Sequence, residues 1–419
     1  MTALNLKYGC ENISFTLPVD IPREILRSKA QEALSDPTKA ILQALRSPIA
    51  SAPLGEKLQP GGSVCIIVND ATRVARSEIF LPVLIEELHR AGVREEDIFI
   101  IFASGTHRSL KRDEMVALVG EEIAARIRLY NHDCRNEKEL TCLGRTSFGT
   151  PVYINKMAAE ADLRILTGSV VHHFFAGFGG GRKALVPGVA GWETIRRNHS
   201  LLLDERASTG RLAGNPVHED LLEAALLARG DFLLNTVLNE EHEIVQVFAG
   251  DMVEAHLAAC ALVEEINGVK ISSLADVVIA SCGGYPKDIN LYQAHKALNN
   301  AMAALKAGGK VIFLAECREG VGSEAYKEWV YKYTDLSTME KILRNDFVLG
   351  GHKAYTVAKL LRKGRVYLLS EFEAGQARRL GFIPVKSMAE ALEEVYGKEK
   401  NLFTCIMPQA STTVPRPAR

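Results

Sequence analysis

The sequence contains no C-x-x-C pair, although eight of its 419 residues are cysteines. Their spacing argues against zinc ribbons, iron–sulfur clusters and a disulfide framework, and favours reduced, buried thiols in a cytoplasmic protein. The N-terminus lacks the basic segment and apolar run of a signal peptide. No apolar stretch reaches the roughly 18 residues of a membrane span. We therefore expect no membrane association.

An excess of one charge is also missing, because 50 basic side chains face 51 acidic ones. Like charges do not cluster, so the chain offers no obvious surface to nucleic acid or to an acidic membrane. Hydrophobic residues make up 47% and charged residues 24%, a balance typical of folded globular proteins. The length exceeds that of one ordinary core and predicts two domains.

Short runs rich in Val and Ile alternate with helix-length amphipathic segments, which is typical of an α/β architecture. The expected strands cover residues 63–69, 97–103, 163–169, 232–239, 243–249, 310–316 and 365–370, and the fourth and fifth form an antiparallel pair. A helix is expected at 78–91. The strand–helix pattern starts afresh after a helical stretch that ends near residue 266. We therefore expect two α/β domains, at 1–268 and 269–419.

Clusters of polar residues follow three of these runs and a further apolar run, DVVIAS at 276–281. The clusters lie at residues 70–73, 104–108, 170–173 and 282–288. In open α/β sheets, ligands bind at the carboxyl ends of strands. One such cluster is often a helix N-cap. Four clusters, of which two carry His and two carry Arg, favour a shared ligand site.

The segment 177–183, GFGGGRK, has four glycines in five positions and then two cations. Such a loop lets backbone N–H groups approach an anion. It is not a Walker A loop, because Arg182 replaces the glycine before Lys183 and no Ser or Thr follows. It also lacks the third glycine of the dinucleotide fingerprint. The segment predicts binding of an unidentified nucleotide, with a solvated glycine turn as the alternative.

Histidine suits both proton transfer and metal binding, because its pKa lies near neutrality. His107 and His173 each follow a strand within a glycine-containing loop, which favours a functional role. His352 could contact a substrate or lie in a solvated loop. Four other histidines are interpreted as packed or surface residues: His89, His132, His242 and His256.

The stretch 167–199, TGSVVHHFFAGFGGGRKALVPGVAGWETIRRNH, resembles the signature of the nickel-pincer lactate racemase family. Three further motifs resemble that family in the same order: D-x-T-R at 70–73, S-G-T-H-R at 104–108, and G-G-x-P at 283–286 with L-Y-Q-x-x-K at 291–296. The resemblance covers essentially the whole chain. It implies two α/β domains with the active site in the cleft between them.

The resemblance also implies a cofactor, the nickel-pincer nucleotide (pyridinium-3,5-bisthiocarboxylic acid mononucleotide nickel), supplied by dedicated biosynthesis enzymes. The cofactor would provide most of the donors to nickel, whose square-planar preference suits soft ligands and one imidazole. His172 stands beside His173, and the spacing to Lys183 favours His173 as the catalytic residue. The implied roles are an acid–base pair, His107 and His173; cofactor binding, Lys183, Asp70, Thr72, Gly179, Gly180 and Gly181; substrate binding, Arg73, Gln293 and Lys296; and nickel ligation, His199.

By this resemblance the protein is a racemase or epimerase of small 2-hydroxy acids. Reversible hydride transfer through a 2-keto acid avoids removing a weakly acidic proton from C2, and it requires an acid–base pair. Two alternatives stay open. One is a non-catalytic carrier of the cofactor, which would not need His107 and His173. The other is a nicotinamide-type oxidoreductase, which the missing third glycine disfavours.

Overall fold

The computed structural model describes residues 3–397, 399 and 401–417. The chain forms two compact units. We call Ala30–Glu265 the central unit, and Met1–Lys29 together with Ile266–Arg419 the terminal unit. Both combine helices with a six-stranded sheet, which confirms the predicted two-domain α/β class.

The sheet of the central unit has the strand order β13-β12-β9-β4-β5-β6. Its strands are β4 (Val64–Asn69), β5 (Ile98–Ala103), β6 (Arg128–Asn131), β9 (Leu163–Ser169), β12 (Phe232–Leu238) and β13 (Ile244–Gly250). The strands are parallel except that β12 and β13 run antiparallel, as predicted. Five of the six were expected from the sequence.

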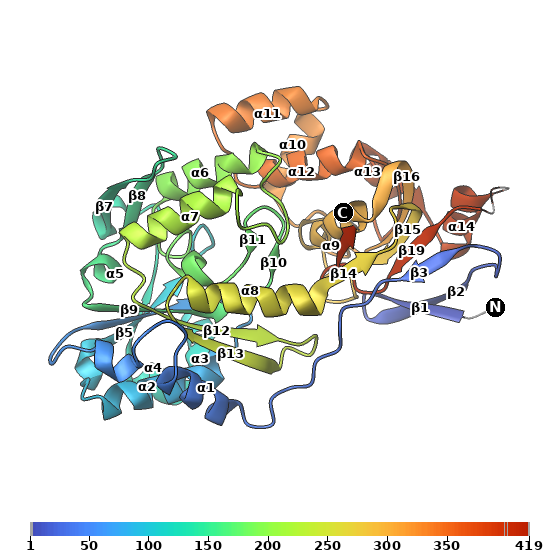
Figure 1. Cartoon of the computed structure of the whole chain (residues 1–419). Coiled ribbons are helices and arrows are strands. Elements are labelled where there is room, and N and C mark those ends of the chain that lie inside the picture. Colours follow the sequence, from blue (N-terminus) through green and yellow to red (C-terminus); the bar gives the residue numbers. More distant parts are fainter. Residues whose placement is uncertain (1–2, 398, 400, 418–419) are drawn as a thin grey trace. The chain divides into compact units, whose positions relative to one another are not determined.

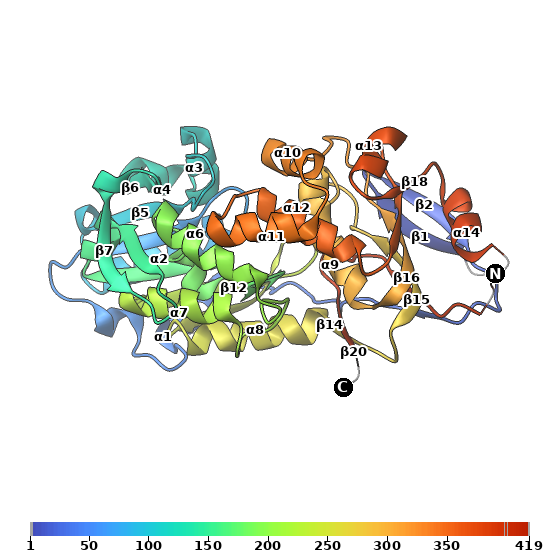
Figure 2. The same cartoon turned by 90° about the horizontal axis from the view of Figure 1, so that it is seen from above.

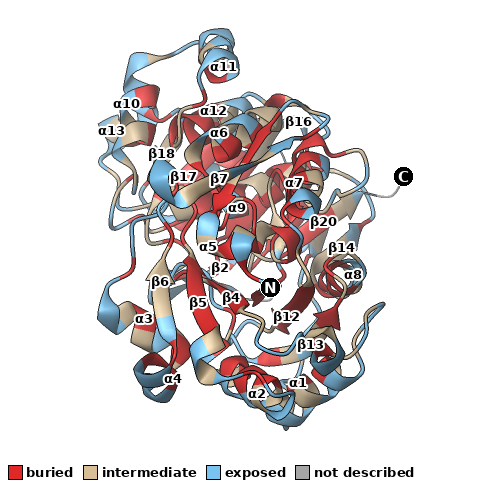
Figure 3. Ribbon diagram, turned by 90° about the vertical axis from the view of Figure 1, so that its left-hand side faces the viewer, coloured by how far each residue is buried: buried red, intermediate tan, exposed pale blue. Residues whose placement is uncertain are grey.

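These strands are continuous apolar runs because helices cover both faces of the sheet. Side chains alternate between the faces, so Ile66 and Ile67 belong to different core clusters. One face carries α1 (Pro37–Arg46), α2 (Ser77–Arg90), α3 (Arg112–Val119) and α4 (Glu121–Arg126). The other carries α5 (Lys156–Glu160), α6 (Trp192–Ser200), α7 (Pro216–Leu227) and α8 (Glu254–Asn267) (Figure 1). In Figure 3 the strands are largely buried, whereas α1 and α2 expose their outer sides.

Shorter elements complete the central unit. Two small antiparallel pairs are β7 (Leu140–Arg145) with β8 (Pro151–Asn155), and β10 (His172–His173) with β11 (Gly177–Phe178). The 3-10 helices are η1 (Leu54–Lys57), η2 (Glu95–Asp97), η3 (Glu137–Glu139), η4 (Gly181–Ala184) and η5 (Leu201–Leu203).

The strand order of the central unit changes direction between β4 and β9. From β4 the chain proceeds to β5 and β6 on one side, and β9, β12 and β13 then build the other side. Ligands in open α/β sheets bind at such a switch point, beyond the carboxyl ends of the strands. The polar segments 70–73, 104–108 and 170–173 follow three neighbouring strands at this edge.

The sheet of the terminal unit is entirely parallel, with the order β18-β17-β16-β15-β19-β3. Its strands are β3 (Arg23–Ile25), β15 (Ala275–Ser281), β16 (Leu305–Leu314), β17 (Arg365–Leu369), β18 (Ile383–Val385) and β19 (Thr404–Met407). Its helices are α9 (Leu291–Ala303), α10 (Glu324–Lys332), α11 (Leu336–Asn345), α12 (Gly351–Leu361), α13 (Ala374–Arg379) and α14 (Met388–Tyr396). A hairpin, β1 (Ala3–Tyr8) with β2 (Glu11–Thr16), and a parallel pair, β14 (Gly268–Ile271) with β20 (Val414–Pro417), are added to it (Figure 2).

The division of the chain differs from the sequence-based one at the N-terminus. The passage from Glu265 to Ile266 lies close to the expected boundary at residue 268, but residues 1–29 fold with the C-terminal part. Strand β3 pairs with β19, where Arg23 stands opposite Thr404. Leu6 joins the core cluster that contains Ile279. None of the described helices has the length and apolar character needed to cross a membrane.

Candidate active site

Asp70 follows β4, and both of its carboxylate oxygens accept hydrogen bonds. The backbone N–H and the hydroxyl of Thr72 donate to Oδ1 at 3.1 and 2.7 Å, closing a tight turn of the Asx type. The ring of His107 contacts Oδ2 through Nδ1. Asp70 is 3% exposed, so these two neighbours replace its hydration.

The carboxyl of Asp70 stays ionised at neutral pH. Burial by itself would raise its pKa, but the hydrogen bond and charge of His107, the Thr72 hydroxyl and the charge of Arg73 together lower it below the ordinary value. An ionised carboxylate only accepts hydrogen bonds, so Nδ1 of His107 must carry a proton. In the neutral ring, Nε2 of His107 therefore holds a lone pair and can act as a base.

His107 is presented by the loop after β5. Its backbone N–H donates to Ser104 O at 2.8 Å, and Gly105 donates to Gly188 O at 2.9 Å. Gly105 has a φ of +54°, and a Cβ there would lie 3.4 Å from the carbonyl oxygen of Pro187. The loop therefore rests on the turn that follows Lys183, while the His107 side chain stays 45% exposed and accessible to a small molecule.

Arg73 is an exposed cation next to this pair. Its Nη1 donates to the carbonyl and hydroxyl oxygens of Thr72 at 3.2 and 3.3 Å. Within the described parts of the chain, no carboxylate forms an ion pair with Arg73. Its guanidinium can therefore accept an anionic ligand without first breaking a salt bridge.

His173 and His172 occupy successive positions in β10 and therefore point in opposite directions. His172 contacts Glu264 on α8 through Nε2 at 2.8 Å and packs on Phe178. The N–H of Ala176 donates to Nδ1 of His173 at 3.2 Å, so the proton of the neutral His173 ring is on Nε2. The two adjacent histidines thus have different surroundings.

Phe175 is surrounded by three of the expected site residues. Its ring centroid lies 4.5 Å from that of His173 and 5.1 Å from that of His199, and Nζ of Lys183 lies 5.9 Å from it. Sequence reasoning did not single out Phe175, and the only available signal was its position two residues after His173. The structure therefore brings His173, Lys183 and His199 together around one aromatic side chain.

Hydrogen bonds fix the ring of His199 near the end of α6. Its Nδ1 lies 3.1 Å from Oδ1 of Asn198. The Asn198 amide nitrogen donates to Val217 O at 3.1 Å and to Asp220 at 2.8 Å, which identifies the opposite amide atom as the acceptor oxygen. Nδ1 of His199 therefore carries the proton and Nε2 a lone pair, as a metal ligand requires.

Asp220 anchors this arrangement from α7. It is fully buried and also accepts hydrogen bonds from the hydroxyls of Thr146 at 2.5 Å and Thr150 at 2.9 Å. Sequence reasoning missed both Asp220 and Asn198, because the contacts join residues up to 74 positions apart. Burial of His199 and the charge of Lys183 lower the pKa of His199 to about 3. The ring is therefore neutral over the whole physiological range.

The glycine-rich loop is shaped mainly by close packing. The N–H of Gly179 donates to Val171 O at 2.8 Å, and that of Gly181 donates to Oδ1 of Asn235 at 2.8 Å. A Cβ on Gly181 would lie 2.5 Å from Cγ of His256. These N–H groups thus already have protein acceptors, and the packing explains the glycine at 181 without an anion.

Gln293 and Lys296 lie together on the first turns of α9 in the terminal unit. Nζ of Lys296 donates to Oε1 of Gln293 at 3.0 Å, and the Gln293 N–H is capped by Asn290. His352 is buried at the start of α12, where its Nδ1 accepts the N–H of Gly350 at 3.2 Å. The segment 350–353 is therefore not the solvated loop that was one of the two expectations.

Comparison with known sequences gives a consistent result over both units. Residues 8–210 match the family described as lactate racemase N-terminal domain, and residues 270–412 match the lactate racemase C-terminal domain. A lactate racemase of Thermoanaerobacterium thermosaccharolyticum is 35% identical over 402 residues, covering 94% of each chain. One from Lactiplantibacillus plantarum is 33% identical over 412 residues, covering 95% of this chain and 96% of the relative.

Solved structures agree with the sequence matches. The lactate racemase apoprotein from T. thermosaccharolyticum superimposes with a TM-score of 0.91 at 34% identity, covering 99% of this chain and 100% of that structure. A Thermotoga maritima protein superimposes with a TM-score of 0.68 at 19% identity, covering 93% of this chain and all of that protein. The second likeness concerns the fold alone.

Proposed function

The chain belongs to the lactate racemase family, a family of isomerases, and on that premise we propose that it inverts the C2 centre of a small 2-hydroxy acid such as lactate. The observation that carries this proposal is the Asp70–His107 pair. It gives the central unit a histidine with a free base position beside an exposed cation, Arg73. A base and an anion site are what the inversion of a 2-hydroxy acid needs.

We further propose that the cofactor is a nickel-pincer nucleotide held by Lys183 and His199. The residues present fit this group, because His199 is neutral and the proton on its Nδ1 puts the lone pair of the ring on Nε2, in the tautomer that binds a metal. Nζ of Lys183 lies 5.9 Å from the ring centroid of Phe175, which also packs against His199. When bound, the cofactor supplies a reversible hydride acceptor for C2. Asp70, Thr72, Gly179, Gly180 and Gly181 are proposed to support it.

In this proposal His107 takes the hydroxyl proton of the substrate through Nε2. The imidazolium that forms is stabilised by Asp70, whose carboxylate is buried and ionised. This carboxylate also holds the ring in the tautomer that leaves Nε2 free. Arg73, Gln293 and Lys296 are each proposed as substrate-binding residues, for the carboxylate and the hydroxyl.

His173 is proposed to serve the opposite face of the substrate. Because the Ala176 N–H donates to Nδ1, the neutral ring carries its proton on Nε2, and this N–H is proposed to donate a hydrogen bond to the substrate oxygen. To transfer a full proton, His173 must be protonated on Nδ1, which is incompatible with the N–H of Ala176 donating to the same atom. The exchange of roles between His107 and His173 therefore requires the segment 174–176 to shift.

Asp220 is proposed to position the nickel ligand through Asn198. Asp220→Asn places an amide where three donors now meet, so Asn198 is expected to turn and His199 to lose its fixed tautomer. We expect nickel affinity to fall about 10- to 100-fold, the usual effect of removing a partner behind a metal ligand. Nickel retained by protein that is co-expressed with the cofactor biosynthesis enzymes and then dialysed against a chelator, with far-UV circular dichroism for folding, checks this.

A matched control for Asp220→Asn is Glu223→Gln, which removes a charge from the exposed side of the same helix, where Glu223 binds Ser147. This control should retain nickel as the unsubstituted protein does. Equal nickel affinity in the folded Asp220→Asn and Glu223→Gln proteins would contradict the positioning role.

The hydride path is tested with substrate deuterated at C2. Holoenzyme made together with the cofactor biosynthesis enzymes is run to partial racemisation in normal water. Hydride does not exchange with water, so the inverted product should keep most of its deuterium and form more slowly than from unlabelled substrate. Mass spectrometry of the separated enantiomers measures the label. Nearly complete loss of deuterium from the inverted product would exclude this path.

A further inference from the structure

The proposed catalytic residue His173 lies on a hairpin that is too short to be stable by itself. Strands β10 and β11 pair through two residues each, His172 with Phe178 and His173 with Gly177. An isolated two-stranded hairpin is at best marginally stable in water. The position of His173 must therefore be fixed by contacts between the hairpin and the rest of the central unit.

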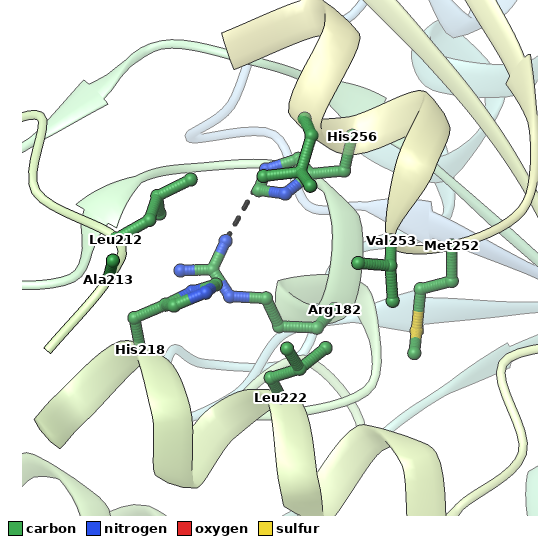
Figure 4. A pocket seen from close by; sticks show the side chains of 9 residues that line it. Arg182, Leu212, Ala213, His218, Leu222, Met252, Val253 and His256 are labelled. Carbon is green, nitrogen blue, oxygen red and sulfur yellow. Dashed lines mark hydrogen bonds between the residues drawn. The ribbon is translucent and has the colours of Figure 1, made fainter. Parts of the chain in front are cut away.

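The turn and the second strand of this hairpin are held by Arg182 and by helix α8. Nη2 of Arg182 donates to Ala176 O at 2.9 Å and to Phe178 O at 3.3 Å. His256 projects from α8 toward Arg182 (Figure 4), and its Nε2 donates to Gly179 O at 2.9 Å. These contacts act on the part of the hairpin that follows β10.

Strand β10 itself is held through His172, the neighbour of His173. Nε2 of His172 lies 2.8 Å from Oε2 of Glu264 on α8, and its ring centroid lies 4.7 Å from that of Phe178. A carboxylate only accepts hydrogen bonds, so Nε2 carries the proton that joins the two side chains. The His172 side chain is 8% exposed, against 38% for Glu264, so the imidazole is enclosed where the hairpin meets the helix.

Helix α8 can serve as an anchor because it is itself fixed in the core. Its first turn is capped by Asp251, whose Oδ1 accepts the N–H groups of Val253 and Glu254 at 2.8 and 3.0 Å. Glu264 directly follows the buried Val263, so packing fixes the backbone that carries the carboxylate. The contact with His172 therefore ties β10 to a rigid element.

We propose that His172 and Glu264 form a positioning pair for His173. The pair holds β10 against α8, and because neighbouring residues of a strand point to opposite faces, it directs the His173 ring to the other face of β10. His172 thus acts through His173 and is not itself a catalytic residue. The inference rests on the proposed function for the role of His173, whereas the contact between His172 and Glu264 belongs to the chain without cofactor.

Loss of this contact should affect turnover more than substrate affinity. An acid–base group acts only from a near-attack geometry, and a misplacement of about 1 Å can cost about 10²-fold in rate. Arg73, the proposed anion site, follows a different strand, β4, and is not held by the pair. We therefore expect kcat to fall at least about tenfold and KM to change less than about threefold.

Three variants separate the hydrogen bond from the packing of the ring. His172→Phe keeps a ring against Phe178 and removes the Nε2–H group. Glu264→Met removes the acceptor from the half-exposed side of the contact and keeps a good helix former. His172→Gln is the conservative variant, because its amide N–H can still donate to Glu264, and it should retain kcat. The matched control is Glu254→Met, which removes a carboxylate from the exposed start of the same helix.

The contact is first tested on the full-length chain without cofactor. Hydrogen exchange followed by mass spectrometry reports on the segment 172–179. This segment should exchange at least about tenfold faster in His172→Phe and Glu264→Met, as expected for the loss of a hydrogen bond to a charged group. In His172→Gln and Glu254→Met it should exchange at the rate of the unsubstituted protein.

The consequence for catalysis is then measured on holoenzyme made together with the cofactor biosynthesis enzymes. Reactions started from each lactate enantiomer give kcat and KM for every variant. The double variant His172→Phe/Glu264→Met should lose no more kcat than His172→Phe alone, because both substitutions remove one shared contact.

Three results would overturn the proposal. They are unchanged exchange of the segment 172–179 in the folded His172→Phe and Glu264→Met proteins, faster exchange without a loss of kcat, and a loss of kcat in His172→Gln as large as that in His172→Phe. If His172→Phe does not fold, Glu264→Met decides the question. If the unsubstituted holoenzyme racemises no 2-hydroxy acid, the proposed function fails, and the exchange experiment alone decides whether the pair holds β10.

Discussion

His199→Ala is expected to abolish nickel retention, with a loss of affinity above about 100-fold. His199 is the proposed single protein ligand, and Nε2 is its only lone pair, because Nδ1 donates to Asn198. Loss of the ligand itself should lower nickel affinity more than loss of a residue that only positions the ligand. The measurement is metal analysis of protein co-expressed with the cofactor biosynthesis enzymes and passed through gel filtration.

The controls for His199→Ala are the two histidines that are proposed to contact the substrate and not the metal. His107→Ala and His173→Ala should both keep nickel at the level of the unsubstituted protein. A His199→Ala protein that is folded and carries the same nickel content as these two would refute the ligand assignment.

His107→Ala is expected to reduce turnover by about 10²- to 10⁴-fold, the range for loss of a general base. The two enantiomers of a substrate such as lactate have equal free energies, so kcat/KM must fall by the same factor in both directions. Chiral chromatography of reactions started from each enantiomer measures both values.

Asp70→Asn tests whether His107 acts as a base only in the tautomer that Asp70 fixes. An asparagine amide can donate to Nδ1 of His107, which would move the ring proton to Nε2 and remove the base. Turnover should therefore fall at least about 100-fold while His107 is still present. Asp97→Asn, which makes the same change in a carboxylate that pairs with Arg94 before β5, is the matched control and should keep normal turnover. Turnover within tenfold of normal in Asp70→Asn would contradict the assignment of His107 as the base.

The central sheet could be predicted because its strands are buried on both faces. Strands such as β4 and β5 are then uninterrupted apolar runs, and the polar residues after them mark the carboxyl edge. The site residues Asp70 and His107 were found by this route, and the structure joins them by a hydrogen bond.

Contacts between distant segments could not be predicted in this way. His256 was interpreted as a packed or surface residue, and it is packed, but the sequence did not show that its neighbours are Gly181 and Arg182. The glycines of the loop were interpreted as an anion cradle, whereas the neighbours of Gly181 already require the absence of a side chain. A local pattern identifies a glycine or a helix face but does not reveal which segment packs against it.

The N-terminal residues illustrate the same limit. Strand β3 has three residues, and its partner β19 lies some 380 positions later, so no local periodicity connects them. The sequence-based division therefore placed residues 1–29 in the N-terminal domain, whereas they fold with the C-terminal part. Its boundary at residue 268 is close to the passage from Glu265 to Ile266.

The terminal unit combines segments from both sides of the central unit in the sequence, and this affects the order in which the chain folds during synthesis. A ribosome completes the central unit, Ala30–Glu265, while most of the terminal unit is still unmade. Domains generally fold as units during synthesis, so the central unit can form its sheet first. The hairpin of β1 and β2 can pair locally, but β3 has no neighbour in its sheet until β19 has been translated. This N-terminal segment is thus among the last parts of the described chain to reach its native position, and apolar side chains such as Leu6 and Leu17 stay exposed until the core they join has been made.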